Sequence, residues 1–74
     1  KISQPLAGIS TEHYFKKNAQ AYDKPCNNKI DTIKYDGNIF LITDRLYRCD
    51  YWWYKVYVAP WQRYVWFKED AIQN

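Results

Sequence analysis

Few side chains in this chain are placed to carry out catalysis. His13 is the one histidine, and no serine or cysteine motif accompanies it, although a catalytic nucleophile needs an adjacent base. The sequence contains neither a phosphate-binding loop nor a dinucleotide motif. Scattered aspartates lie in turn-like segments, where such carboxylates cap the local backbone: Asp23, Asp31, Asp36, Asp44 and Asp50. Two of these aspartates acting as the paired carboxylates of a glycosidase remain an alternative. However, 74 residues leave little room for a substrate cleft, so we expect that the protein is not an enzyme.

The two cysteines, Cys26 and Cys49, do not have the spacing of metal ligands. Two distant cysteines and a single histidine make a poor zinc set, so we expect no metal and no cofactor. An even number of cysteines in a small domain favours a disulfide, and a disulfide favours an oxidising compartment. The alternative is a pair of buried free thiols in a cytosolic protein.

Aromatic residues are the most distinctive chemical feature. The chain has four tryptophans, eight tyrosines and three phenylalanines, and they concentrate between Asp50 and Phe67. Such rings partly compensate for small size, because each buries a large area. A domain of this size has interior room for only part of them, so the others should form an exposed patch, which usually marks a binding site. Trp52 and Trp61 are the tryptophans expected at the surface.

The charge is mild, with eleven basic and eight acidic residues and a net charge of +3. Aromatic residues interleaved with lysine and arginine on a small β-domain could hold single-stranded nucleic acid by stacking. The modest charge, the eight acidic residues and the expected disulfide argue against this, so we expect no nucleic-acid partner. No stretch approaches the length of a transmembrane helix, so we expect no membrane span.

Strand-forming residues dominate the second half of the chain, and glycine and proline divide it into short runs. The pattern predicts one all-β domain with five to six short strands, as a half-open barrel or small sandwich. Residues 1–12 should form an N-terminal arm, with a possible helical turn at 10–13, and residues 13–74 the barrel. Extended segments are expected at 13–17, 19–23, 29–35, 39–43, 52–58 and 64–67, with 39–43 central and buried. Connections are expected at 24–29, 35–38, 44–50 and 59–63, and one 3₁₀ turn at 68–72.

The segment "WWYKVYV" shows strand periodicity. Alternation places Tyr54, Val56 and Val58 on one face and Trp53, Lys55 and Tyr57 on the other. Because Lys55 marks its face as solvent-exposed, the first face should be the core. Trp53 and Tyr57 then flank a charge, and their presence on that face needs an explanation.

Four segments resemble the bacterial SH3-like (SH3b) domain family over roughly residues 13–72. These are "AYDKPC", "KIDTIKYDGNIFLI", "WYKV" and "RYVWFKEDAI". Three positions depart from the family pattern, with Asp23 in place of an arginine, Arg63 in place of a glycine and Tyr64 in place of a tryptophan. The resemblance implies a small SH3-like barrel. It places Cys26 and Cys49 in two loops that can approach one another, which makes a disulfide between them plausible.

The resemblance also implies a non-catalytic module of the bacterial cell envelope, secreted or periplasmic, that binds peptidoglycan peptide through an aromatic groove. The alternative is a secreted protein–protein module, such as an inhibitor or immunity-type protein. The expected ligand-binding residues are Tyr22, Tyr51, Trp52, Trp61 and Tyr64, with Asp23 and Arg63 as polar anchors. Trp53 and Trp66 could belong either to the core or to the groove.

Overall fold

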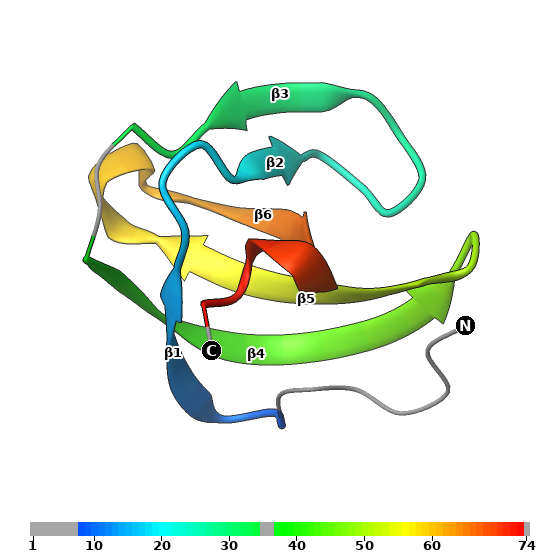
Figure 1. The fold of residues 1–74 in the computed structure, drawn as a ribbon, viewed down its shortest axis with the longest axis horizontal. Coiled ribbons are helices and arrows are strands. Elements are labelled where there is room, and N and C mark those ends of the chain that lie inside the picture. The colour runs from blue at the N-terminus through cyan, green and yellow to red at the C-terminus, as the bar shows by residue number, and fades with distance from the viewer. Residues whose placement is uncertain (1–7, 35–36, 74) are drawn as a thin grey trace.

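A computed structural model describes residues 8–34 and 37–73. Six antiparallel strands form one open sheet in the order β1-β4-β5-β6-β2-β3 (Figure 1). The strands are β1 (Thr11–Phe15), β2 (Gln20–Tyr22), β3 (Lys29–Thr32), β4 (Asn38–Arg48), β5 (Tyr51–Val58) and β6 (Arg63–Lys68). Two 3₁₀ turns, η1 (Ala59–Trp61) and η2 (Glu69–Ala71), follow β5 and β6. The prediction of an all-β fold is confirmed. No helix in the described ranges is long and apolar enough to cross a membrane.

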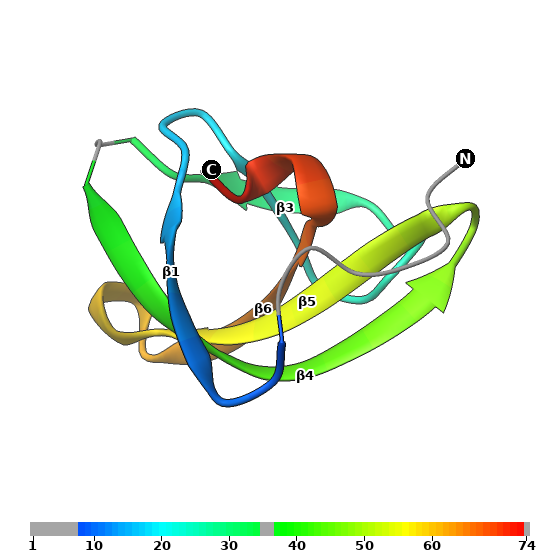
Figure 2. The same ribbon diagram turned by 60° about the horizontal axis from the view of Figure 1, so that its bottom comes forward.

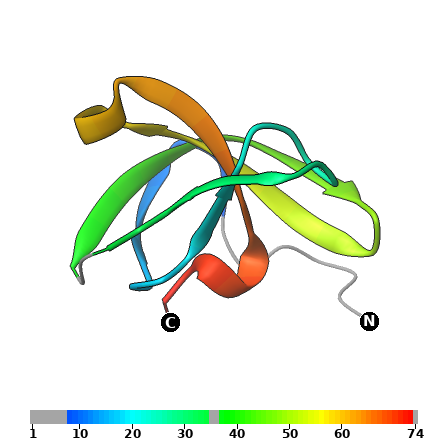
Figure 3. The same ribbon diagram turned by 90° about the horizontal axis from the view of Figure 1, so that it is seen from above.

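The sheet is strongly curved, and its two ends, β1 and β3, are tied to the rest of the molecule by the segments beside them (Figures 2 and 3). After β1, the backbone N–H of Asn18 donates to the Ile33 carbonyl at 2.7 Å, and the Ile33 N–H donates to the Ala19 carbonyl at 2.9 Å. The Lys16 N–H donates to the Ala71 carbonyl at 2.8 Å, which joins the end of β1 to η2. These bonds hold the curved sheet around its core.

The core lies on the concave side of the sheet, where side chains from all six strands or the segments beside them meet. Phe15 packs against Phe40 and Phe67, with ring centroids 5.4 and 5.1 Å apart. The buried hydrophobic cluster comprises Phe15, Ala19, Ala21, Ile33, Phe40, Ile42, Tyr54, Val56, Val58, Val65, Phe67, Ala71 and Ile72. The prediction that Tyr54, Val56 and Val58 face the core is confirmed. The expected 3₁₀ turn near the C-terminus is also present, as η2.

Residues 39–43 are part of β4, which lies between β1 and β5, so the prediction of a central strand is confirmed, but the prediction that it is buried holds for one face only. Phe40 and Ile42 are buried, whereas Ile39 and Leu41 are 47% and 45% exposed. The reason is that β4 lies in an antiparallel sheet, which packs one face on the core and leaves the other to solvent.

The prediction of a polar connection at 44–50 is also wrong, because β4 continues to Arg48. Its polar side chains occupy exposed positions of the strand, after a register shift between Ile42 and Asp44. Only Cys49 and Asp50 separate β4 from β5, and both have positive φ, 56° and 67°. That is the backbone geometry that a two-residue hairpin turn requires.

Two further predictions, a helical turn at 10–13 and a tight turn at 35–38, concern segments that the structure describes in full or in part. Thr11–His13 belong to β1, so the helical turn expected at 10–13 is wrong. The β-branched Thr11 and the strand pairing with β4 favour the extended form. Half of the turn expected at 35–38 lies outside the described residues, which include Gly37 with a φ of 80°.

A disulfide between Cys26 and Cys49 joins the loop after β2 to the β4–β5 turn, which lie at the same end of the molecule (Figure 1). The two Cα atoms are 6.2 Å apart, and the cysteines have a sequence separation of 23. The predicted pairing is therefore confirmed, and it ties two loops that border the same surface.

Candidate ligand-binding surface

The side of β2, β5 and β6 that faces away from the core is lined by aromatic and lysine side chains. Strand alternation makes this surface, because every second residue of each strand points outward. Cross-strand pairs align Trp53 with Lys68, Lys55 with Trp66, and Tyr57 with Tyr64. We define the outer face as Tyr22, Tyr51, Trp53, Lys55, Tyr57, Tyr64, Trp66 and Lys68. Tyr22 extends it onto β2 through its pairing with Trp66.

At one end of the outer face, three aromatic rings surround the ammonium group of Lys68. Its Nζ atom lies 4.5 Å from the ring centroid of Tyr51, 5.4 Å from that of Tyr22 and 5.7 Å from that of Trp53. These distances are within the range of cation–π attraction. We call this group of four residues the Lys68 cage.

Covalent and hydrogen-bonding contacts fix the walls of the Lys68 cage. The Trp53 Nε1–H donates to the Arg48 carbonyl at 2.9 Å, and Tyr22 packs edge-on against Trp53 at a centroid distance of 5.0 Å. The Cys26–Cys49 disulfide joins the loop that follows Tyr22 to the turn that precedes Tyr51. Trp53 is only 1% exposed as a result, although it lies on the face opposite the core. This packing explains why a tryptophan flanks Lys55.

The other end of the outer face is more open. Tyr57 and Tyr64 pack edge-on with centroids 5.1 Å apart, and they are 41% and 53% exposed. The Lys55 Nζ atom lies 5.0 Å from the Tyr64 centroid. Trp66 is half-buried and lies between Lys55 and Tyr22 in the cross-strand register, so it joins the two ends into one surface.

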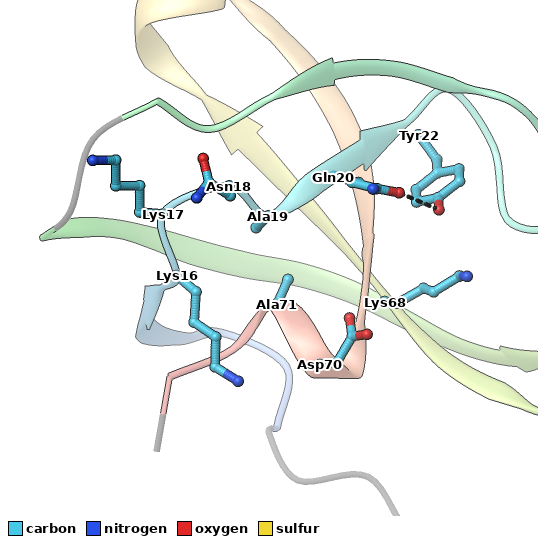
Figure 4. Close-up of a pocket in the computed structure, with 9 residues that line it drawn as sticks. All are labelled: Lys16, Lys17, Asn18, Ala19, Gln20, Tyr22, Lys68, Asp70 and Ala71. Carbon is cyan, nitrogen blue, oxygen red and sulfur yellow. Dashed lines mark hydrogen bonds between the residues drawn. The ribbon is translucent and has the colours of Figure 1, made fainter.

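Two hollows border the Lys68 cage and share Tyr22 and Lys68. The first, of about 310 Å³, lies beside the disulfide and is lined by Tyr22, Cys26, Asn27, Cys49, Tyr51, Trp53 and Lys68. The second, of about 250 Å³, lies between β2 and η2 (Figure 4). Its lining includes Lys16, Lys17, Gln20 and Asp70, and the Tyr22 hydroxyl donates to Gln20 Oε1 at 3.1 Å. Together the hollows offer aromatic rings, amides and lysines, which can contact a ligand by stacking and by hydrogen bonds.

Five of the seven predicted ligand-binding residues lie on the outer face or at its margin. Tyr22 and Tyr51 form walls of the Lys68 cage, and Tyr64 lies at the open end. The two predicted anchors pair with each other, with Arg63 Nη2 3.8 Å from Asp23 Oδ1. Both side chains are about half exposed, so this pair contributes little to stability.

Trp52 and Trp61 lie away from the outer face, and both are half-buried against the hydrophobic core. Trp52 packs edge-on against Tyr47 at 5.3 Å. Trp61 lines a hollow of about 210 Å³ together with Phe40, Val58 and Pro60. Gln62 follows η1, and its φ of 53° reverses the chain into β6 and leaves Trp61 packed against the core. Trp52 and Trp61 are therefore only partly exposed, although both were expected at the surface.

Sequence reasoning did not include Lys55, Tyr57 and Lys68 among the site residues, and it left Trp53 and Trp66 open between the core and the groove. The alternation of β5 had already placed Lys55 and Tyr57 on the solvent-facing side, and the same rule applied to β6 would have added Trp66 and Lys68. The rings that surround Lys68 come from β2 and β5, whereas Lys68 itself lies on β6, so sequence spacing alone could not identify the group.

No group of three or more His, Cys, Asp or Glu side chains gathers within residues 8–34 and 37–73 to hold a metal ion. Comparisons of the chain with protein-family models, curated proteins and solved structures returned no match.

Proposed function

We propose that this domain is a non-catalytic binding module of the bacterial cell envelope, of the SH3-like type, that binds peptidoglycan peptide on its outer face. The observation that carries the proposal is the outer face itself, where tyrosine, tryptophan and lysine side chains cover strands whose opposite face already forms the core. A contiguous exposed patch of this kind usually marks a binding site. Its tyrosines combine flat apolar area with hydroxyl groups, as peptide-binding surfaces commonly do.

The disulfide supports the extracytoplasmic part of the proposal. Disulfides persist in oxidising compartments, such as the periplasm and the extracellular space, and are rare in the cytosol. The six antiparallel strands, with "WYKV" on β5 and its Val56 in the core, support an SH3-like barrel.

A second surface favours the alternative of a protein–protein module, such as an inhibitor or immunity-type protein. Tyr14 of β1 pairs with Ile39 of β4, and these side chains are 53% and 47% exposed. Leu41, two residues further along β4, is 45% exposed. A mixed aliphatic and aromatic patch of this kind suits a folded protein partner rather than a wall peptide.

A sedimentation assay on purified peptidoglycan, with matched tyrosine variants, tests the proposal. Tyr64 and Tyr14 are both 53% exposed, but only Tyr64 lies on the outer face. We expect Tyr64→Ala to weaken wall binding at least about fivefold, as removal of an interface anchor does, and Tyr14→Ala to leave it unchanged. Failure of the parent domain to sediment with the wall would contradict the proposal, and so would equal effects of the two variants.

A further inference from the structure

The ammonium group of Lys68 is held in place without an anionic partner in the described part of the chain. Three rings contact it, whereas the ion pair found among the described residues joins Arg63 to Asp23. An ammonium group carries three N–H donors, and an aromatic face is not a conventional acceptor for them. Within residues 8–34 and 37–73, Lys68 therefore has a fixed position and unused donors.

Lys68 also lies where the two hollows meet. Figure 4 shows its side chain extending toward Tyr22, while the Asp70 carboxylate lies nearer the start of that side chain. Lys16 and Lys17 line the far part of the same hollow, so three lysines oppose one aspartate there. The local field is therefore positive, although the whole chain carries a net charge of only +3.

We propose that Lys68 binds a carboxylate of the ligand, and that the ligand is a peptide with a free carboxylate end whose apolar part lies against Tyr22 and Tyr51. This inference rests on the proposed use of the outer face. Contact with three rings restrains the Lys68 side chain before the ligand arrives, so little rotamer entropy is lost on binding. A hydrogen bond from an ammonium group to a carboxylate is among the stronger polar contacts available to proteins.

The surroundings favour an anionic group of the ligand over a cationic one. A ligand cation would be repelled by Lys68, which already occupies the centre of the three rings. A phosphate with two negative charges would be attracted by the three lysines and repelled by Asp70 more strongly than a carboxylate, so inorganic phosphate is included in the test as a competitor. The flat ring walls beside the disulfide suit a peptide end with a small side chain.

The test uses the whole chain and a matched pair of probes, acetyl-trialanine with a free C-terminal carboxylate and the same peptide with a C-terminal amide. Dissociation constants come from NMR titrations. We expect the free acid to bind the parent domain about tenfold more tightly than the amide. We expect this preference to shrink at high salt, because the charges are partly exposed.

Lys68→Met and Lys55→Met form the matched variant pair, since both lysines lie on the outer face and contact tyrosine rings. Lys68→Met should abolish the preference for the acid, whereas Lys55→Met should keep it. Thermal melts identify any unfolded variant, and Lys68→Arg, which keeps the charge, should keep most of the preference whether or not Lys68→Met folds.

Several results would overturn the inference. These are equal binding of acid and amide, no detectable binding of the acid, a preference that survives Lys68→Met, and inorganic phosphate competing at least as well as the acid. Sedimentation with peptidoglycan is scored separately. A domain that loses wall binding in Tyr64→Ala but does not prefer the acid would keep the proposed function and reject the role of Lys68. A domain that prefers the acid but does not sediment with the wall would keep the role of Lys68 and reject the proposed function.

Discussion

The two faces of the β5–β6 hairpin are built from the same two strands but from different kinds of side chain. On the core face, Tyr54, Val56, Val65 and Phe67 are fully buried. On the outer face, the pair formed by Tyr57 and Tyr64 is about half exposed, and lysines lie beside the rings. The comparison separates two uses of aromatic residues: on one face they fill the interior, and on the other they cover a surface that the core does not require.

Trp53 is the exception to this division between a buried and an exposed face. Trp53 is as buried as the core residues, yet it lies on the outer face and is not part of the hydrophobic core cluster. Tyr22, Tyr51 and Lys68 cover it, and the disulfide joins the loops beside them. Burial alone therefore does not identify core residues in a domain this small, because a second cluster is closed by a covalent bond between loops.

The largest difference between the faces should appear with adjacent substitutions in β5. Val56→Asp places an unpaired charge in the core and should unfold the domain. Lys55→Ala, one residue away, removes one contact with Tyr64 and should lower the free energy of unfolding by less than about 1 kcal/mol. Circular dichroism during urea denaturation measures both. Similar losses in the two variants would show that the assignment of faces is wrong.

Removal of the disulfide should have the next largest effect, and it should affect the two ends of the outer face differently. Cys26→Ser with Cys49→Ser should lower the free energy of unfolding by about 3 kcal/mol, because the unfolded chain gains the freedom of a loop. The Lys68 cage should loosen, while the Tyr57–Tyr64 pair should keep its packing.

The measurement for this variant combines urea denaturation with NMR ring-proton shifts. The free-thiol content of the parent protein, found by alkylation without reductant, is its control. Two free thiols in the parent, or ring shifts at Tyr57 and Tyr64 as large as those at Tyr51, would contradict the expectation.

A smaller loss of stability than that from disulfide removal should come from Trp61. Because it is half-buried against the core, Trp61→Ala should lower the free energy of unfolding by about 1–2 kcal/mol. It should leave binding on the outer face unchanged. A melting temperature equal to that of the parent, together with weaker wall binding, would instead place the ligand site at η1 and not on the outer face.

Much of the fold could be predicted from sequence where local rules decide the outcome. The alternation in "WYKV" predicted the core face of β5, and turn-forming residues separated most of the strands. The second half of β4 was missed because its exposed polar side chains resemble those of a loop, and only pairing with β5 makes the segment a strand. The pairing of the two cysteines could be predicted because the chain offers only one possible pair.

The residues of the candidate site were harder to predict from sequence than the fold. Tyr22, Tyr51 and Tyr64 could be selected through the resemblance to SH3-like domains, and all three lie on the outer face. Lys68 could not be selected in this way, because its surroundings depend on the register of β5 against β6 and on the loop after β2. Trp61 was expected to be more exposed because sequence does not show how a short turn folds back on the core.

The most direct test of the outer face as the binding surface uses the four tryptophan indole N–H signals of the folded protein. Trp53 and Trp66 report on the outer face, whereas Trp52 and Trp61 pack against the core. On titration with soluble peptide fragments of peptidoglycan, we expect the Trp66 and Trp53 signals to shift together, with little change at Trp52 and Trp61. Shifts confined to Trp52 or Trp61, or no shift in any of the four at saturating ligand, would contradict the account.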